Sequence, residues 1–228
     1  FSKETCTYSR KRISTWDNDF IDLDFSKVGS KNLVLLIHGL EGSSESRYMA
    51  STSKHLNTKG LDTVCFNLRG CSGDDNLLLG TYHSGKTEDL SLVINQAVSQ
   101  GYQEIALIGF SIGGNKTLLH LGRESTLIPK EVIAAVTFSV PCDLTASSNH
   151  LAQRSHRLYM TNFLKSFEAK LTEKQSRFPE QINLIDFDKI KTFKDFDERY
   201  TAPLNGFNSA EEYWQQSSCL PYLGKIKV

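Results

Sequence analysis

The sequence predicts an α/β fold built on a doubly wound, mostly parallel sheet, and three observations carry this prediction. Apolar runs without alternation, at residues 32–37 and 104–110, are typical of strands buried on both faces. Amphipathic stretches with a helical period lie between such runs. A serine flanked by glycines, within the GFSIG stretch at residues 109–113, joins an apolar run to the next helical stretch. Strands and helices that alternate in this way imply a parallel sheet with helices on both faces.

The N-terminal part is expected to form a hairpin at the edge of this sheet. Residues 8–14 and 20–25 alternate apolar with polar side chains, and the turn-forming residues 16–19 separate them. Four further strands are expected, because each corresponds to an apolar run with little alternation. These strands are expected at residues 32–37, 61–68, 104–110 and 132–140.

Helices are expected between these strands, at residues 46–58, 87–99 and 111–121. Each stretch is closely followed by a glycine, the residue that most often ends a helix in the left-handed conformation. The three glycines are Gly60, Gly101 and Gly122.

The part of the chain after Pro141 is expected to be a helical insertion that covers the core. Residues 144 to about 178 are rich in Lys, Arg, Glu and Gln and predict one long helix, which Pro179 ends. A loop is expected at residues 201–207. A short helix capped by a serine is expected at residues 209–216.

The chain therefore divides into three parts. Residues 1–143 are the α/β core, residues 144–220 the helical cap, and residues 221–228 the start of a further core strand. This strand is expected to continue after Val228. A parallel sheet without its last strands has an unpaired edge, so the 228-residue chain alone is expected to self-associate through that edge.

Composition excludes several classes of function. The chain has 26 basic and 26 acidic side chains, and a net charge of zero provides no general field for nucleic acid. No apolar run approaches the roughly 20 residues of a membrane-spanning helix. The five cysteines are odd in number and include no C-x-x-C pair, so a framework of disulfides is not expected. Free cysteines favour a reducing compartment, and the expected location is the cytoplasm. Association with a membrane is the alternative if a segment precedes Phe1, and no metal or cofactor is expected.

Ser111 is the candidate nucleophile. In a strand–turn–helix context the G-x-S-x-G pattern places a serine hydroxyl clear of the sheet, and Gly109 and Gly113 avoid a collision across the sharp turn. The N–H of Ile112 then begins a helix, where negative charge is stabilised, so it suits a tetrahedral oxyanion. The competing interpretation is a glycine-rich turn with an ordinary surface serine.

The loops that follow the other strands supply further candidates. In the loop after residues 32–37, the N–H of Leu40 is the candidate second oxyanion donor. His38 is either a catalytic base or, as we favour, a side chain that holds the loop. Arg69 is expected to brace the site by binding a carboxylate or backbone carbonyls. His83 is a second candidate base, and bracing the entry to the next helix is its favoured role.

Together and in this order, these motifs resemble the YheT-like branch of the α/β-hydrolases. The resemblance implies an α/β-hydrolase fold and a carboxylic-ester hydrolase that acts on short- or medium-chain esters or acylglycerols, with some relatives that act on phospholipids. It also implies Ser111 as the nucleophile and Leu40 and Ile112 as the oxyanion donors. The motifs are His38-Gly39-Leu40-Glu41-Gly42-Ser43-Ser44, Arg69-Gly70-Cys71-Ser72-Gly73, Tyr82-His83-Ser84-Gly85, Gly109-Phe110-Ser111-Ile112-Gly113-Gly114-Asn115, Ser139-Val140-Pro141-Cys142-Asp143-Leu144, Phe196-Asp197, Thr201-Ala202-Pro203 and Gly206-Phe207.

The resemblance places the catalytic acid and histidine after Val228, so we expect an incomplete triad in this chain. Asp143 is the weak alternative acid within the chain, and a structural role is favoured for it. His150 and His156 belong to the predicted insertion and are expected to be solvated. A non-catalytic module that binds an acyl ligand or a partner is the alternative from another class, and a thioesterase or acyltransferase is a lesser one.

Overall fold

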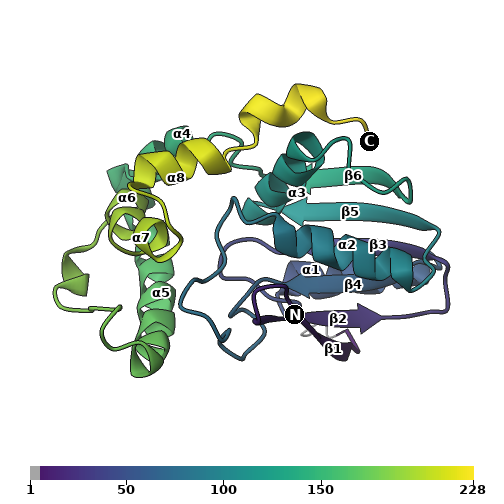
Figure 1. Cartoon of the computed structure of the whole chain (residues 1–228), viewed down its shortest axis with the longest axis horizontal. Helices are drawn as coiled ribbons and strands as arrows, with labels where there is room; N and C mark the ends of the chain where they lie inside the picture. Colours follow the sequence, from purple (N-terminus) through teal and green to yellow (C-terminus); the bar gives the residue numbers. More distant parts are fainter. Residues whose placement is uncertain (1–5) are drawn as a thin grey trace.

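In the computed structural model, which describes residues 6–228, six strands form one sheet in the order β1-β2-β4-β3-β5-β6 (Figure 1). Strands β3, β4, β5 and β6 are parallel, whereas β2 runs antiparallel to both β1 and β4. The predicted mostly parallel sheet and its N-terminal edge hairpin are therefore confirmed. The strands are β1 (Ser9–Ser14), β2 (Phe20–Ser26), β3 (Asn32–Ile37), β4 (Asp62–Asn67), β5 (Glu104–Phe110) and β6 (Val132–Phe138).

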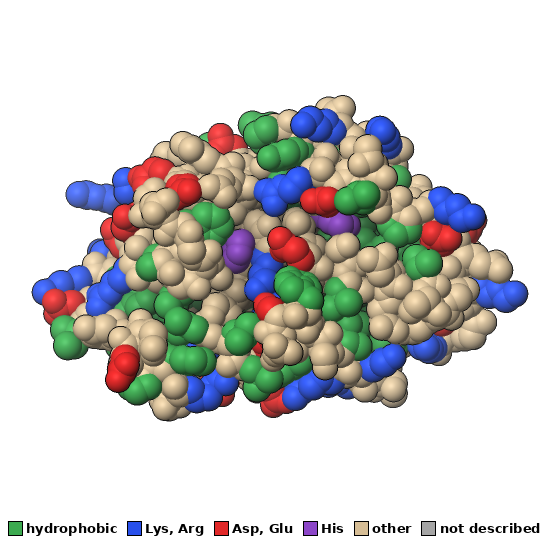
Figure 2. All heavy atoms as spheres, in the orientation of Figure 1, with side chains coloured by type: hydrophobic (Ala, Val, Ile, Leu, Met, Phe, Trp, Pro, Cys, Tyr) green, Lys and Arg blue, Asp and Glu red, His purple; other side chains and the backbone are tan. Residues whose placement is uncertain are grey.

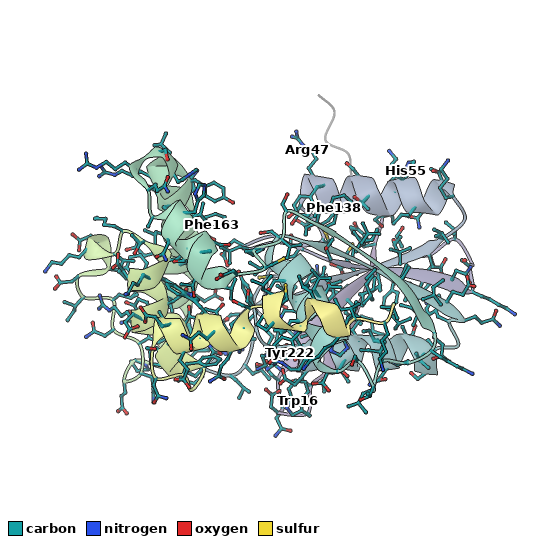
Figure 3. All side chains as sticks on the ribbon, turned by 90° about the horizontal axis from the view of Figure 1, so that it is seen from above. Trp16, Arg47, His55, Phe138, Phe163 and Tyr222 are labelled. Atoms are coloured by element: carbon teal, nitrogen blue, oxygen red, sulfur yellow. The ribbon has the colours of Figure 1, made fainter. Side chains whose placement is uncertain are left out.

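Helices cover both faces of this sheet. Helix α1 (Arg47–Thr58) lies on one face, and α2 (Glu88–Ser99) and α3 (Ile112–Arg123) lie on the other, as the view in Figure 3 shows. The position of β3 between the two helical layers explains why its sequence is apolar without alternation. Its odd-numbered side chains pack toward α2, and its even-numbered ones pack with Met49 of α1. Both faces of β3 are thus inside the protein.

Two of the three predicted helix-ending glycines have that role. Gly60 and Gly101 adopt φ values of +77° and +87°, each two residues after the last residue of α1 or α2. The prediction for Gly122 is wrong, because α3 continues through it to Arg123. A Cβ at Gly122 would lie 2.7 Å from the Cβ of Tyr222. The glycine is therefore needed for the close approach of the C-terminal segment to α3.

The residues after β6 form a separate helical layer beside the carboxyl ends of the parallel strands (Figure 1). We call this layer, from α4 to α8, the cap. Its elements are α4 (Leu144–Leu151), η1 (Arg154–His156), α5 (Arg157–Arg177), η2 (Phe187–Lys189), α6 (Phe193–Phe196), the π-helical turn η3 (Asp197–Thr201), α7 (Ala202–Leu204) and α8 (Ala210–Ser217). The short helix capped by Ser209 is confirmed as α8. The loop predicted at residues 201–207 is wrong in part, because α7 lies within it.

The prediction of one helix from residue 144 to about 178 is also wrong. The helix ends at Leu151, Gln153 is extended with ψ 149°, and α5 begins at Arg157. The two halves bury different apolar surfaces. Leu144 of α4 packs with Trp214 of α8, whereas α5 packs into a cluster of phenylalanines within the cap. The break lets each half reach its own cluster.

The start of a further strand predicted at residues 221–228 does not form. Residues Leu220–Lys225 form a 3₁₀ helix, η4, which lies along α3, and the chain beyond it has no regular structure. Strand β6 is the edge of the sheet, and its Ile133, Val136 and Phe138 are about half exposed. Association through this edge stays a prediction.

Charged side chains of both signs are mixed over the face seen in Figure 2, in keeping with the net charge of zero. All five cysteines are free thiols. Within residues 6–228, no helix is both long and apolar enough to cross a membrane. In the same part of the chain, no group of three or more His, Cys, Asp or Glu side chains is arranged to hold a metal ion.

Candidate active site

Ser111 occupies a strained turn between β5 and α3. Its φ of 53° and ψ of −119° are unfavourable for a residue with a side chain. Hydrogen bonds on both sides hold this conformation: the Ser111 N–H donates to Phe138 O at 2.8 Å, and the Asn115 N–H donates to Ser111 O at 3.0 Å. Strain of this kind persists where the surrounding structure enforces it, and it is concentrated at functional sites.

The glycines around Ser111 allow three backbone segments to meet. A Cβ at Gly109 would lie 2.6 Å from Gly114 Cα, as expected for a collision across the turn. A Cβ at Gly113 would instead lie 2.5 Å from the carbonyl oxygen of Ile37, at the end of β3. Gly113 is thus required by the neighbouring strand and not by Gly109. Without it, α3 could not begin so close to the loop that follows β3.

The loop after β3 is fixed by His38. Leu68 N–H donates to Nε2 of the buried ring at 3.0 Å, so Nδ1 carries the proton and donates to Gly39 O at 2.7 Å. Burial lowers the pKa of His38 to about 4, which keeps the ring neutral. Because both ring nitrogens are engaged in holding the loop, the arrangement favours the bracing role over that of a base.

The two candidate oxyanion donors lie at the same cavity as Ser111. Ile112 is the first residue of α3, so its N–H has no acceptor within the helix. Leu40 belongs to a tight turn closed by a hydrogen bond of 3.0 Å from Gly42 N–H to Gly39 O. Among residues 6–228, no hydrogen bond from the N–H of Leu40 is found. Both donors are therefore available to an oxygen atom placed beside Ser111.

The cavity has a volume of about 1000 Å³ and lies between the core and the cap. Ser111, Leu40 and Ile112 belong to its core side, and the cap contributes a mainly apolar wall. Phe163, labelled in Figure 3, is part of that wall. A volume and lining of this kind fit a ligand with a sizeable apolar part. The apolar cap residues are Leu144, Ala146, Leu151, Leu158, Tyr159, Phe163, Phe167, Leu171, Phe193, Phe196, Tyr213 and Trp214.

Arg69 binds carboxylates, one of the two kinds of partner expected for it, and its role in bracing the site stays a prediction. Its buried guanidinium binds both oxygens of Asp89 at 2.7 and 2.8 Å and both oxygens of Asp17 at 2.9 and 3.1 Å. A further bond of 3.1 Å reaches Asp19. Burial alone would raise the pKa of Asp17, but hydrogen bonds from Arg69 and Thr15 lower it to about 2. The cluster joins the β1–β2 turn to the loop after β4 and to α2.

His83 lies in an aromatic setting at the cavity. Its ring meets Phe207 and Tyr213 edge-on at 5.4 and 5.7 Å, and Nδ1 accepts from Gly85 N–H at 3.2 Å. Burial, together with the charge of Lys116, holds the pKa of His83 well below its usual value. The Lys116 Nζ also donates to His83 O at 2.9 Å. These contacts favour bracing of the loop before α2.

The remaining candidates do not complete a triad among residues 6–228. Asp143 caps α4, because its Oδ1 accepts from Ala146 N–H at 3.0 Å. His150 and His156 lie with ring centroids 4.8 Å apart at the cap side of the cavity, and His150 is exposed. In this part of the chain, no histidine nitrogen is hydrogen-bonded to the Ser111 hydroxyl.

The structure adds two acidic residues whose roles sequence reasoning missed, Glu41 and Asp197. Both line the cavity, and both side chains are nearly buried. Asp197 lies in the π-helical turn, where Trp214 Nε1 donates to its Oδ2 at 2.8 Å. Burial raises the pKa of Asp197 to about 6. An acidic residue within an aromatic stretch carries no local signal that it is buried.

Replacement of Asp197 with asparagine is expected to make stability less dependent on pH. Because the pKa is raised from 3.8 to about 6 in the folded state, the wild-type protein loses stability as the pH rises through this range. The loss amounts to at most about 3 kcal/mol. Asparagine keeps an acceptor for Trp214 and has no charge to bury. Urea unfolding of both proteins between pH 4 and 8 measures this, and parallel pH profiles would contradict the prediction.

A strained serine between a parallel strand and a helix, with a glycine-containing loop beside it, defines the class of α/β-hydrolase proteins. The family model for the alpha/beta hydrolase fold matches residues 32–207, and the chain belongs to this family.

Three similar proteins agree with this assignment. The chain is 33% identical to the putative esterase YheT of Escherichia coli (strain K12) over 95% of its length, and it spans 65% of that protein. It is 28% identical to the human phospholipase ABHD3 over 100% of its length and spans 58% of that relative. The structure of the Pyrococcus furiosus esterase Pf2001 superimposes with a TM-score of 0.57 at 21% identity, over 71% of this chain and 64% of the other. That likeness concerns the fold.

Proposed function

We propose that this chain is the nucleophile-bearing part of a serine hydrolase that cleaves carboxylic esters. The observation that carries the proposal is the position of Ser111, in a strained turn at a large cavity with the free N–H groups of Leu40 and Ile112. The names of the similar proteins, an esterase and a phospholipase, support ester hydrolysis.

In the proposed mechanism, the Ser111 hydroxyl attacks the ester carbonyl, and the N–H groups of Leu40 and Ile112 bind the oxyanion that forms. Collapse of this intermediate releases the alcohol and leaves an acyl-enzyme, which water then hydrolyses. A base must take the serine proton. We propose that this base and its acid partner lie outside residues 6–228, because no histidine there is hydrogen-bonded to the Ser111 hydroxyl and the chain spans only 65% and 58% of two relatives.

The cavity supports the proposed class of substrate. Its volume of about 1000 Å³ and the phenylalanines of its cap wall fit the acyl part of a short- or medium-chain ester or acylglycerol. Ser111 and the N–H groups of Leu40 and Ile112 lie on its core side, where the ester carbonyl would lie.

Labelling with a fluorophosphonate probe tests this proposal. In the full-length protein that contains this chain, the probe is expected to attach to Ser111, and digestion followed by mass spectrometry locates the adduct. The Ser111→Ala variant serves as the control and is expected to stay unlabelled. An adduct on another residue in an ester-hydrolysing preparation would refute the assignment.

A non-catalytic module that binds an acyl ligand is the second candidate. It is favoured by the lack of a histidine bonded to Ser111 among residues 6–228. A full-length protein that binds a fatty acid or an ester analogue, but neither reacts with the probe nor hydrolyses esters, would support it over the first candidate.

A further inference from the structure

The carboxylate of Glu41 connects the loop after β3 to the cap. Glu41 directly follows Leu40, and its side chain is only 8% exposed. Lys170 Nζ of α5 donates to its Oε1 at 3.0 Å, and Ser166 of the same helix donates to Oε2. From the core, the Tyr82 hydroxyl donates to Oε1 at 2.6 Å. One carboxylate thus receives bonds from both sides of the cavity.

The backbone of Glu41 is itself strained. Its φ is 56°, in the left-handed region that favours glycine. The Glu41 N–H donates to the Tyr82 hydroxyl at 3.0 Å, so the same tyrosine holds the main chain and the side chain. A relaxed turn would redirect the peptide group that joins Leu40 to Glu41, and the N–H of Leu40 lies in the peptide group just before it in the same tight turn. The contacts of the carboxylate therefore stabilise a backbone that presents this N–H.

A second set of contacts attaches α5 to the core without touching this loop. Lys174 Nζ lies 3.0 Å from Asp75 Oδ1, and Arg177 also binds that carboxylate. The helix is thus fastened at two places, and only the one at Glu41 reaches the proposed oxyanion donor. This separation provides a matched control for the general attachment of the cap.

We propose that Glu41 is a positioning residue that holds the Leu40 N–H in its oxyanion-binding position, and that the seating of α5 on the core controls this position. The inference rests on the proposed function and deepens it. When α5 is seated, Ser166 and Lys170 fix the carboxylate, and the turn holds its strained conformation. When α5 moves away, the carboxylate loses two of its three side-chain donors, and the turn relaxes.

Kinetics of the full-length protein with a pair of substrates test this role. The substrates are an oxoester and the matching thionoester, in which the developing charge falls on sulfur. Sulfur accepts hydrogen bonds weakly, so thionoester hydrolysis depends less on the oxyanion donors. In Glu41→Gln we expect kcat for the oxoester to fall about 10- to 100-fold with a KM within about threefold of wild type. The ratio of oxoester to thionoester rates is expected to fall with it.

Two variants of the cap side extend the test. Ser166→Ala and Lys170→Gln are expected to lower the same ratio, and to add little in the Glu41→Gln background, because all three act through one carboxylate. If Glu41→Gln does not fold, these two variants still give the readout. Glu168→Gln, an exposed glutamate of α5, and Asp75→Asn, at the other attachment, are expected to leave the ratio unchanged.

The outcomes separate this inference from the proposed function. A wild-type protein without a Ser111 adduct and without ester hydrolysis refutes the proposed function. A wild-type protein that is active, with a Glu41→Gln variant of unchanged kcat, overturns the role of Glu41 alone. An equal loss for both substrates overturns it too, because a merely structural defect lowers both rates alike.

Discussion

Replacement of Ser111 with alanine is expected to lower kcat/KM for a short-chain ester by about 1000-fold or more in the full-length protein. The variant loses the hydroxyl oxygen that forms the acyl bond in the proposed mechanism, while Leu40, Ile112 and the cavity stay in place. Residual turnover by bound water is therefore expected to be slow but measurable. Steady-state hydrolysis of a chromogenic acyl ester checks this. Ser99→Ala, which changes an exposed serine of α2, is the control and should be fully active.

The stability of Ser111 variants provides a second readout of the same position. Because φ is 53° there, alanine keeps the strain that serine has, whereas Ser111→Gly is expected to relieve it. We expect the glycine variant to be inactive yet more stable by about 1 kcal/mol or more. Wild-type activity in either variant would show that the nucleophile lies elsewhere.

Those parts of the fold in which every side chain of a segment is buried could be predicted from the local sequence. Strand β3 could be located because both of its faces are covered, which leaves no polar position in the run from Leu33 to Ile37. The ends of α1 and α2 could be located because their glycines adopt positive φ. Gly122 is also a glycine near a helix end, but it allows close contact with Tyr222 and does not end the helix. Only the tertiary packing distinguishes these two roles.

The helical character of the cap could be predicted from its composition, but the course of the chain through it could not. Nothing in the residues around Gln153 marks a break in the helix. The break arises because α4 and α5 pack into two separate apolar clusters. The 3₁₀ helix at Leu220–Lys225 likewise depends on the surface of α3.

Within the candidate site, the residues whose positions depend on a local turn could be predicted from the sequence. Ser111 and Ile112 follow from a strand–turn–helix pattern, and Arg69 from its need for buried carboxylates. The contact of Ser166 with Glu41 joins residues 125 positions apart, and no short motif encodes such a pair. Long-range polar contacts of this kind become visible only in the folded chain.

The cluster around Arg69 is expected to produce the largest effect on stability. Arg69→Met should reduce the free energy of unfolding by about 3–5 kcal/mol, because a hydrophobic side chain of similar length leaves the buried Asp19 and Asp89 without their cation. Asp17 keeps only its longer contact of 3.6 Å with Lys86. The side chains of Asp19 and Asp89 are 0% and 4% exposed, so water cannot replace the lost hydrogen bonds. Asp19 also accepts from Leu77 N–H at 2.7 Å, so the loop after β4 should loosen as well.

The pH dependence of this variant distinguishes a charge effect from lost packing. In the wild-type protein the pKa values of Asp17 and Asp19 are lowered, so these carboxylates add stability above the unfolded value of 3.8 that is lost as the pH falls toward about 2. Without Arg69, burial at Asp17 is no longer offset by the hydrogen bonds from that side chain, so the pKa of Asp17 rises above its wild-type value and this carboxylate adds less stability as the pH rises. Asp19 keeps the bonds from Asn76 and backbone N–H groups that lower its pKa. The difference between the two proteins is therefore expected to narrow in acid, as urea unfolding at pH 4 and pH 7 would show. A further change of Asp89 to asparagine should recover part of the loss at pH 7, since it removes one unpaired charge. A constant difference at both pH values would instead assign the loss to packing.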